Sequence, residues 1–176
     1  MSNLVVHVIP RHDPLNYYYP VSRLITIGER VINNTSDMVN QLRSMTMRTT
    51  LTSLLSWPPR PRQRVQVHHV ARLIITGHGT PTSFRIGTDR ITLPVLEDAN
   101  NPVRHKLRLL APLFTQNAVV VLRECRTGQS QPLMRAFSRV LGGVRVRGSE
   151  DGQLAFAPGL IGNVVECRMD TCRAVE

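Results

Sequence analysis

The stretch ARLIITGHGT, residues 71–80, runs from a series of apolar residues directly into Gly-His-Gly. Short apolar runs rich in β-branched residues are typical of strands that are buried on both faces of a parallel sheet. A second such run, AVVVLREC at 118–125, ends on a cysteine in the same way. We therefore expect two central strands, with His78 and Cys125 just past their carboxyl ends.

From residue 65 onward, strand patterns alternate with helix patterns. This alternation is typical of an α/β domain with a mainly parallel central sheet and helices packed on it. Before residue 65 the clearest elements are an apolar strand and a capped amphipathic helix. Strands are expected at 3–9, 21–27, 71–76, 118–123 and 144–148, a hairpin at 84–94, helices at 34–45, 101–114 and 131–143, and one or two edge strands within 153–169.

A chain of 176 residues with 41% apolar content can bury one sizeable core, so we expect a single domain over 1–176. The segment WPPRPRQR, residues 57–64, interrupts regular structure, because proline lacks an amide donor and constrains the residue before it. We expect an exposed, protease-sensitive connection there, with the preceding helix extending toward Trp57.

The chain contains three cysteines, an odd and small number for its length. This number argues against a disulfide framework and for a reducing compartment, with at least one free thiol. We interpret Cys167 and Cys172 as a strand end and an exposed tail, which oxidation can still pair. The sequence has no run of eighteen apolar residues and no leader pattern, so we expect a soluble cytoplasmic protein and no membrane partner.

The formal net charge is +10, from 22 basic and 12 acidic residues, and Lys106 is the single lysine. Such a surface attracts polyanions, but coding bias in a GC-rich genome gives the same excess of arginine, and the charge alone leaves both interpretations open. His105 lies in the basic segment RHKLR, where a solvated helix face is expected and phosphate binding is the less favoured alternative.

The two strand ends predict a reaction site. In parallel sheets the carboxyl ends of the strands line one crevice, so the imidazole of His78 and the thiol of Cys125 converge if their strands are neighbours. Histidine can take the thiol proton during attack on an amide carbonyl and then protonate the leaving amine. Gly77 and Gly79 allow close backbone approach, and the backbone amides of Gly79 and Cys125 are candidate oxyanion donors.

The segment IITGHG, followed 47 residues after its histidine by the cysteine of VVVLRECRTG, resembles the caspase-like (clan CD) cysteine peptidases. Caspases likewise carry their histidine about fifty residues before the cysteine. VVLRECRTG is similar to bacterial CHAT domains, and LMRAFSRVLGGVRVRG is similar to the self-cleaving domains of bacterial toxins. The resemblance covers about 65–150; residues 3–9 match the family's first strand, and 10–64 have no counterpart.

The resemblance implies a three-layer domain with helices on both faces of the sheet. It also implies an endopeptidase that uses a His78–Cys125 dyad to cleave a specific protein, either its own precursor or a partner polypeptide, in the cytoplasm or after delivery into a host cytosol. A specificity pocket beside the cysteine would bind one side chain of the substrate.

The charge of that pocket is left open by the sequence. Arg123, two residues before the cysteine, and Arg147 favour an acidic substrate side chain. Glu124, Glu150 and Asp151 favour arginine or lysine instead.

Toxin-type relatives further imply an inositol polyphosphate activator bound in a basic cleft, although no residue here matches that cleft individually. No metal is expected, because His68 and His69 are adjacent and would face opposite ways on a strand. Two rival functions remain: a catalytically inactive caspase-like scaffold, and an arginine-rich module that binds nucleic acid or another polyanion.

Overall fold

The computed structural model describes residues 2–10, 29–49, 64–66, 68–152, 160 and 162–175. The strand expected at 21–27 and the proline-rich connection lie outside these residues, except for Arg64 at the end of that connection. Within the described part, a large sheet, a layer of helices and two small antiparallel sheets make up the structure.

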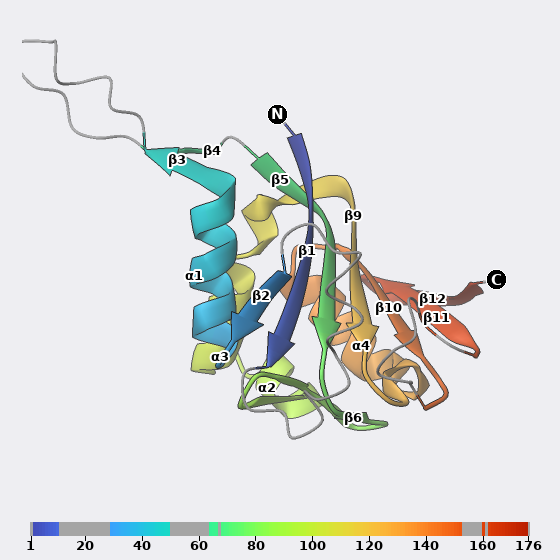
Figure 1. The fold of residues 1–176 in the computed structure, drawn as a ribbon. Helices are drawn as coiled ribbons and strands as arrows, with labels where there is room; N and C mark the ends of the chain where they lie inside the picture. The colour runs from blue at the N-terminus through green and yellow to red at the C-terminus, as the bar shows by residue number, and fades with distance from the viewer. Residues whose placement is uncertain are drawn as a thin grey trace, which may run out of the picture.

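The central sheet has seven strands in the order β12-β11-β10-β9-β5-β1-β2 (Figure 1). The five strands from β2 to β10 run parallel, and β11 and β12 form an antiparallel hairpin at one edge. The expected α/β class with a mainly parallel sheet is therefore confirmed. The strand bounds are β1 (Ser2–Pro10), β2 (Glu29–Ile32), β5 (His68–Thr76), β9 (Phe114–Arg123), β10 (Arg145–Ser149), β11 (Val164–Arg168) and β12 (Thr171–Val175).

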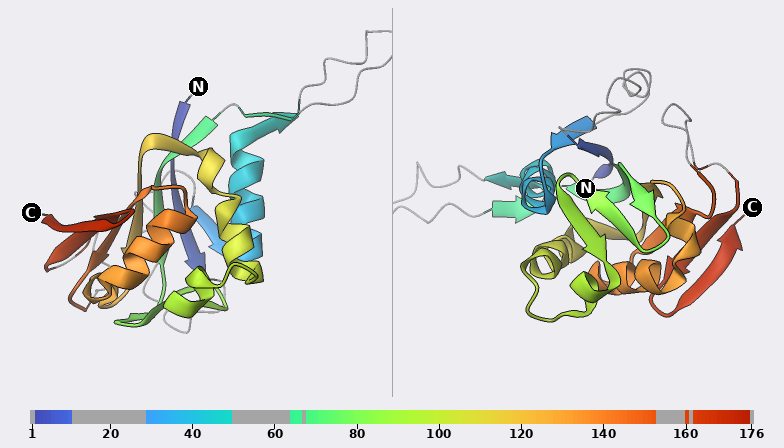
Figure 2. Two further views of the ribbon diagram at one scale, coloured as in Figure 1. Left: turned by 180° about the vertical axis from the view of Figure 1, so that it is seen from behind. Right: turned by 90° about the horizontal axis from the view of Figure 1, so that it is seen from below.

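The described helices all lie on one face of this sheet (Figure 2). They are α1 (Thr35–Thr46), α2 (Leu93–Glu97), α3 (Pro102–Arg108) and α4 (Gln131–Val140). Helix α3 contacts α1, α2 and α4, so the four form one continuous layer. The second helical layer of a three-layer domain is not found among the described residues. No helix in this part of the chain combines the length and apolar character needed to cross a membrane.

The main core fills the space between the sheet and these helices. Strand alternation directs Val8, Leu73 and Val120 into it, where they meet buried side chains of the helices such as Met38 and Phe137. The intervening strand residues point to the opposite, helix-free face. That face is also buried near the carboxyl ends of the central strands, and it contains His7, Thr76, Val121 and Arg123.

A small sheet of β6 (Gly79–Thr80), β7 (Ser83–Ile86) and β8 (Asp89–Thr92) covers one end of the main sheet. It contains the expected hairpin, which turns at Gly87 with a φ of 61°. The turn is fastened to the start of α1, because the Thr88 N–H donates to the Asn33 carbonyl at 2.7 Å and the Asp89 carboxylate accepts the Thr35 N–H at 2.8 Å. A two-stranded sheet pairs β3 (Met47–Thr49) with β4 (Arg64–Gln66).

Two helices are shorter than the sequence predicts. Helix α1 ends at Thr46, where the chain enters β3, and does not continue toward Trp57. Helix α3 ends at Arg108 and a separate 3₁₀ turn, η3 (Ala111–Leu113), follows it. Pro112 explains the break, because in a continuous α-helix it could not donate a hydrogen bond to the Arg108 carbonyl and its ring would clash with that carbonyl.

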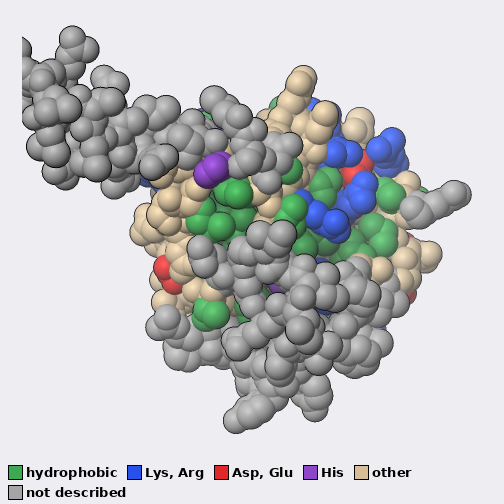
Figure 3. Space-filling view, turned by 45° about the horizontal axis from the view of Figure 1, so that its top comes forward, with side chains coloured by type: hydrophobic (Ala, Val, Ile, Leu, Met, Phe, Trp, Pro, Cys, Tyr) green, Lys and Arg blue, Asp and Glu red, His purple; other side chains and the backbone are tan. Residues whose placement is uncertain are grey.

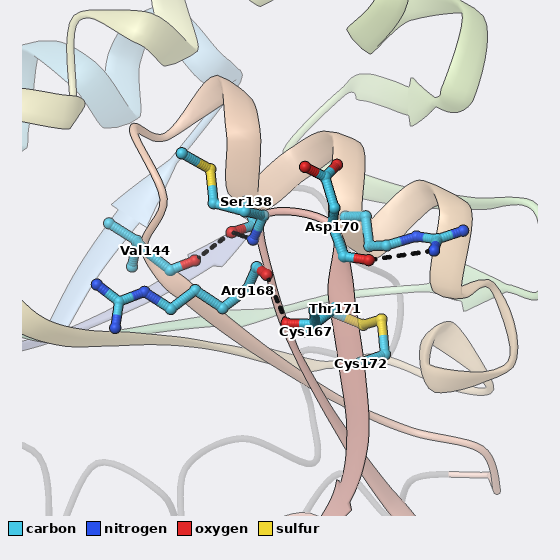
Figure 4. The surroundings of a disulfide bond; sticks show 9 residues. Ser138, Val144, Cys167, Arg168, Asp170, Thr171 and Cys172 are labelled. Atoms are coloured by element: carbon cyan, nitrogen blue, oxygen red, sulfur yellow. Dashed lines mark hydrogen bonds between the residues drawn. A yellow bond between two sulfur atoms is a disulfide. The ribbon is translucent and has the colours of Figure 1, made fainter.

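The carboxyl-terminal hairpin corrects the interpretation of Cys167 and Cys172. They are not a strand end and an exposed tail, because they lie directly opposite each other on β11 and β12 and form a disulfide, with Cα atoms 4.1 Å apart (Figure 4). Cys167 is buried in the main core. Cys125 is not part of a disulfide.

Ser138 joins this hairpin to α4. Its buried hydroxyl donates to the Val144 carbonyl at 2.6 Å and accepts the N–H of Met169, in the hairpin turn, at 2.9 Å (Figure 4). One side chain therefore fixes the end of α4, the start of β10 and the β11–β12 turn relative to one another.

We predict that Ser138→Ala lowers the free energy of unfolding by about 2 kcal/mol, because it leaves a buried carbonyl and a partly buried N–H without this partner. Ser44→Ala is the matched control, since the Ser44 hydroxyl is exposed and bonds only within α1. Its effect should stay within about 0.5 kcal/mol. Urea denaturation measures both, and equal effects would contradict the joining role of Ser138.

Candidate functional site

His78 and Cys125 follow neighbouring parallel strands. Strands β5 and β9 are adjacent in the sheet, and Thr76 pairs with Arg123 at the end of their ladder. Each candidate residue lies two positions beyond that pair. Strands β5 and β9 both end at the lower edge of the sheet in Figure 1. The His78 side chain is exposed and Cys125 is half-buried, so both are accessible from solvent.

The two loops that carry these residues touch through Gly79. A methyl group built on Gly79 would lie 2.8 Å from Cβ of Glu124, 2.8 Å from Cγ2 of Thr127 and 2.9 Å from the carbonyl oxygen of Cys125. No side chain fits there unless the Cys125 loop moves. Gly79 is therefore required for close approach, whereas a methyl group on Gly77 would have its nearest neighbours at 3.5 Å, an ordinary contact distance.

The Cys125 loop is also fixed on its other side. Arg126 has a φ of 58°, a left-handed conformation that is uncommon for a residue with a side chain, and its N–H donates to the Asp151 carbonyl at 3.0 Å. Gly128 packs on the end of β10 so closely that a methyl group on it would lie 2.8 Å from the Gly148 carbonyl. Strained residues held by their surroundings concentrate at functional sites, so Arg126 is consistent with a functional Cys125 loop.

Glu124 supports the loops rather than lining a pocket with Arg123. It is fully buried, its carboxylate accepts the Arg85 N–H at 3.0 Å, and the same carboxylate borders Gly77. Glu124 thus lies between the His78 loop and β7. Because successive residues alternate, Arg123 points to the helix-free face, and the structure does not bring these two side chains together.

On the helix-free face, Arg123 lies near a buried histidine that the sequence analysis did not single out. Nε2 of His7, on β1, is 2.6 Å from the Thr76 hydroxyl. Burial, and secondarily the charge of Arg123, lower the pKa of His7 to about 4, so its imidazole is neutral near pH 7. A histidine inside the apolar run NLVVHVI was the signal available in the sequence.

The three other residues expected to line the specificity pocket lie in two different places. Glu150 and Asp151 form the turn after β10, beside the Cys125 loop; the Glu150 carbonyl accepts Gln129 at 2.7 Å, and the Asp151 carboxylate accepts the Asn163 N–H at 2.8 Å. Arg147 lies within β10 and further from the Cys125 loop, because it pairs with Val121 in the middle of the β9–β10 ladder. The structure therefore brings the turn, but not Arg147, to the Cys125 loop.

Arg147 belongs instead to a cluster around Glu166. The Glu166 carboxylate accepts hydrogen bonds from Arg147 at 2.7 Å and Arg173 at 2.8 Å, with Arg145 at 3.9 Å. Burial alone would raise the pKa of Glu166, but these hydrogen bonds and charges lower it below its usual value. Figure 3 shows basic side chains gathered around an acidic one on the β10–β12 side of the molecule.

His68 and His69 begin β5 and lie at the opposite end of that strand from His78. In the described part of the chain, no group of three or more histidine, cysteine or carboxylate side chains is placed to hold a metal ion.

We predict different outcomes for two neighbouring glycine substitutions. Gly79→Ala should destabilise the protein by about 1–3 kcal/mol, because its methyl group overlaps the Cys125 loop. Gly77→Ala should have an effect below about 1 kcal/mol, since its methyl group meets only ordinary contacts. Urea denaturation and the rate of Cys125 alkylation, which reports on the accessibility of its thiol, measure the change. Similar results for both variants would contradict the loop contact.

His7 should make stability depend on pH. Its pKa is about 4 in the folded protein and 6.5 in the unfolded chain, so below pH 6.5 the unfolded chain binds a proton that the folded protein does not. Stability from this site therefore falls by about 2 kcal/mol between pH 7.5 and pH 5. His7→Gln, whose amide can still bond to the Thr76 hydroxyl, should lack that loss. Urea denaturation of wild type and His7→Gln at both pH values measures the difference. Equal losses of unfolding free energy in the two proteins would contradict the prediction.

No protein-family model, curated protein or solved structure matches this chain.

Proposed function

We propose that the protein is a cysteine endopeptidase with a His78–Cys125 dyad. One observation carries the proposal: an accessible imidazole and a half-buried thiol that is not part of a disulfide follow adjacent parallel strands, on loops whose backbones touch at Gly79. Ligands of open α/β sheets bind at this edge of the sheet. The mainly parallel sheet, with β1 beside β5, is compatible with the caspase-like domain that the sequence resembles.

The reaction requires no further side chain. The Cys125 thiol passes its proton to His78 while its sulfur attacks the carbonyl carbon of the substrate peptide bond. As the tetrahedral intermediate collapses, the carbon–nitrogen bond breaks and protonated His78 gives its proton to the departing amine. Water, deprotonated by His78, then hydrolyses the thioester and releases the acid product and the free thiol.

Backbone amides are the proposed stabilisers of the negative oxygen in each tetrahedral intermediate. The N–H groups of Gly79 and Cys125 are the candidates, because both belong to the two touching loops. A well-placed oxyanion donor contributes about 3 kcal/mol to the transition state. Packing around the Cys125 loop would hold these donors in a fixed arrangement before substrate binds.

Of the two substrate preferences left open by the sequence, an acidic side chain before the cleaved bond is better supported. The Glu124 carboxylate is turned toward Arg85, and that of Asp151 holds the Asn163 backbone. Both carboxylates therefore have structural roles. Of the two arginines expected in the pocket, Arg123 is buried at the end of β9, two residues before Cys125, whereas Arg147 lies further along the sheet from the Cys125 loop.

Cleavage of a positional peptide library and of candidate precursor proteins tests the proposal. We expect wild type to cleave after acidic residues, and Cys125→Ala or His78→Ala to lose at least about a thousandfold in rate while remaining folded. A thiol alkylator should block wild type. Parallel assays with inositol hexakisphosphate test the proposed polyanionic activator.

Three outcomes separate the alternatives. Equal cleavage by wild type and Cys125→Ala would contradict the proposed dyad. A folded wild type that cleaves nothing, with or without the activator, indicates the inactive scaffold. Nucleic-acid affinity that falls steeply with salt and is unchanged in Cys125→Ala indicates the binding module.

A further inference from the structure

A cleft on the helical side of the molecule is lined by three arginines. It has a volume of about 350 Å³ and lies between α2, α3 and α4. Arg104 and Arg108 come from α3, one turn apart, and Arg139 comes from α4. This size is in the range of small-molecule sites.

The floor of the cleft is apolar. Leu96 from α2 and Ala136 and Val140 from α4 line it, and all three are buried. A bound molecule could therefore place an apolar body against these side chains while its polar end meets the arginines. This combination of an apolar floor and a few convergent polar groups is typical of ligand sites.

The guanidinium groups are only partly neutralised within the described residues. Nε of Arg104 is buried without a hydrogen-bond acceptor, and its Nη1 reaches only the backbone carbonyl of Glu97, at 3.3 Å. The Glu97 carboxylate also borders the cleft, but no ion pair joins it to a described arginine. Arg108 has no hydrogen-bond or ion-pair partner in the described part of the chain, and Arg139 pairs with the exposed Asp170 at 2.7 Å.

A bound anion would accept hydrogen bonds from these guanidinium groups and neutralise their charge. A buried donor without an acceptor is destabilising, and neighbouring guanidinium groups repel one another. The planar guanidinium fork fits the oxygens of a phosphate or carboxylate. In contrast, the arginines around Glu166 already have a buried carboxylate between them.

We propose that this cleft binds a small organic anion, with a phosphate or carboxylate head held by Arg104, Arg108 and Arg139 and an apolar body on Leu96, Ala136 and Val140. The site is independent of the proposed peptidase activity. Its limited volume and apolar floor favour a small molecule over a nucleic-acid backbone, which would follow an extended basic surface.

Isothermal titration calorimetry on the full chain tests the site with phenyl phosphate, phenylacetate, inorganic phosphate and benzyl alcohol. Phenyl phosphate or phenylacetate should bind with one-to-one stoichiometry, and which of them binds more tightly identifies the head group. Inorganic phosphate and benzyl alcohol should each bind at least about tenfold more weakly than the better probe, because each lacks one half of the ligand.

Lys106→Ala is the matched control, because it removes one positive charge from α3 outside the cleft lining. Arg108→Ala should weaken the better probe by about tenfold or more, and Arg104→Lys, which keeps the charge but loses the fork, by several-fold. Lys106→Ala should change affinity by less than about twofold. Absence of saturable binding by phenyl phosphate and phenylacetate, or equal losses in Lys106→Ala and Arg108→Ala, would overturn the proposal.

Discussion

The close approach of Gly79 to the Cys125 loop is the constraint on which the carboxyl edge of the sheet depends. Parallel pairing of β5 and β9 brings the two loops to the same edge, but pairing alone does not fix how the loops beyond the strands are arranged. The contact fixes them, since the backbone of Gly79 occupies the space that a side chain would need. Glu124 supports the arrangement by bonding to β7, and Asp151 by bonding to Arg126.

The two faces of the sheet contribute differently. The helix-covered face is apolar and supplies most of the core, so it determines stability. The helix-free face carries polar groups near the strand ends, including His7, Thr76 and Arg123. Neutral His7 can lie beside the Arg123 guanidinium without adding a second positive charge, which explains how two basic residues share this buried region.

Local patterns predicted most elements correctly, because each depends on neighbouring residues. Apolar runs predicted β1, β5 and β9, and the stretch VRVRG predicted β10. Gly142 and Gly143, both with positive φ, follow the end of α4 as expected. The continuous apolar character of β5 and β9 predicted that both strands lie in the middle of the sheet. Whether they are neighbours was left open by the sequence, and it is the structure that pairs them and brings the His78 and Cys125 loops together.

Features that depend on contacts between distant segments were not predicted. The sequence shows Gly79 but not the loop packed on it, which begins 45 residues later at Glu124. The side of β9 to which Glu124 points follows from strand alternation, yet its bond to Arg85 depends on where β7 lies. Cys167 and Cys172 were misinterpreted because the turn between them, where Met169 has a φ of 52°, closes a hairpin within five residues.

The arginine content acquires meaning only when the partners of individual arginines are known. Arg145, Arg147 and Arg173 surround a buried carboxylate, so their charge is largely compensated within the fold. Arg104 and Arg108 have no carboxylate partner in the described part of the chain, although they line a cleft with an apolar floor. Both groups contribute equally to the net charge, but the first group, around Glu166, has a structural role. The second group retains the capacity to bind an external anion, so the cleft, rather than the total charge, is the stronger argument for an anionic ligand.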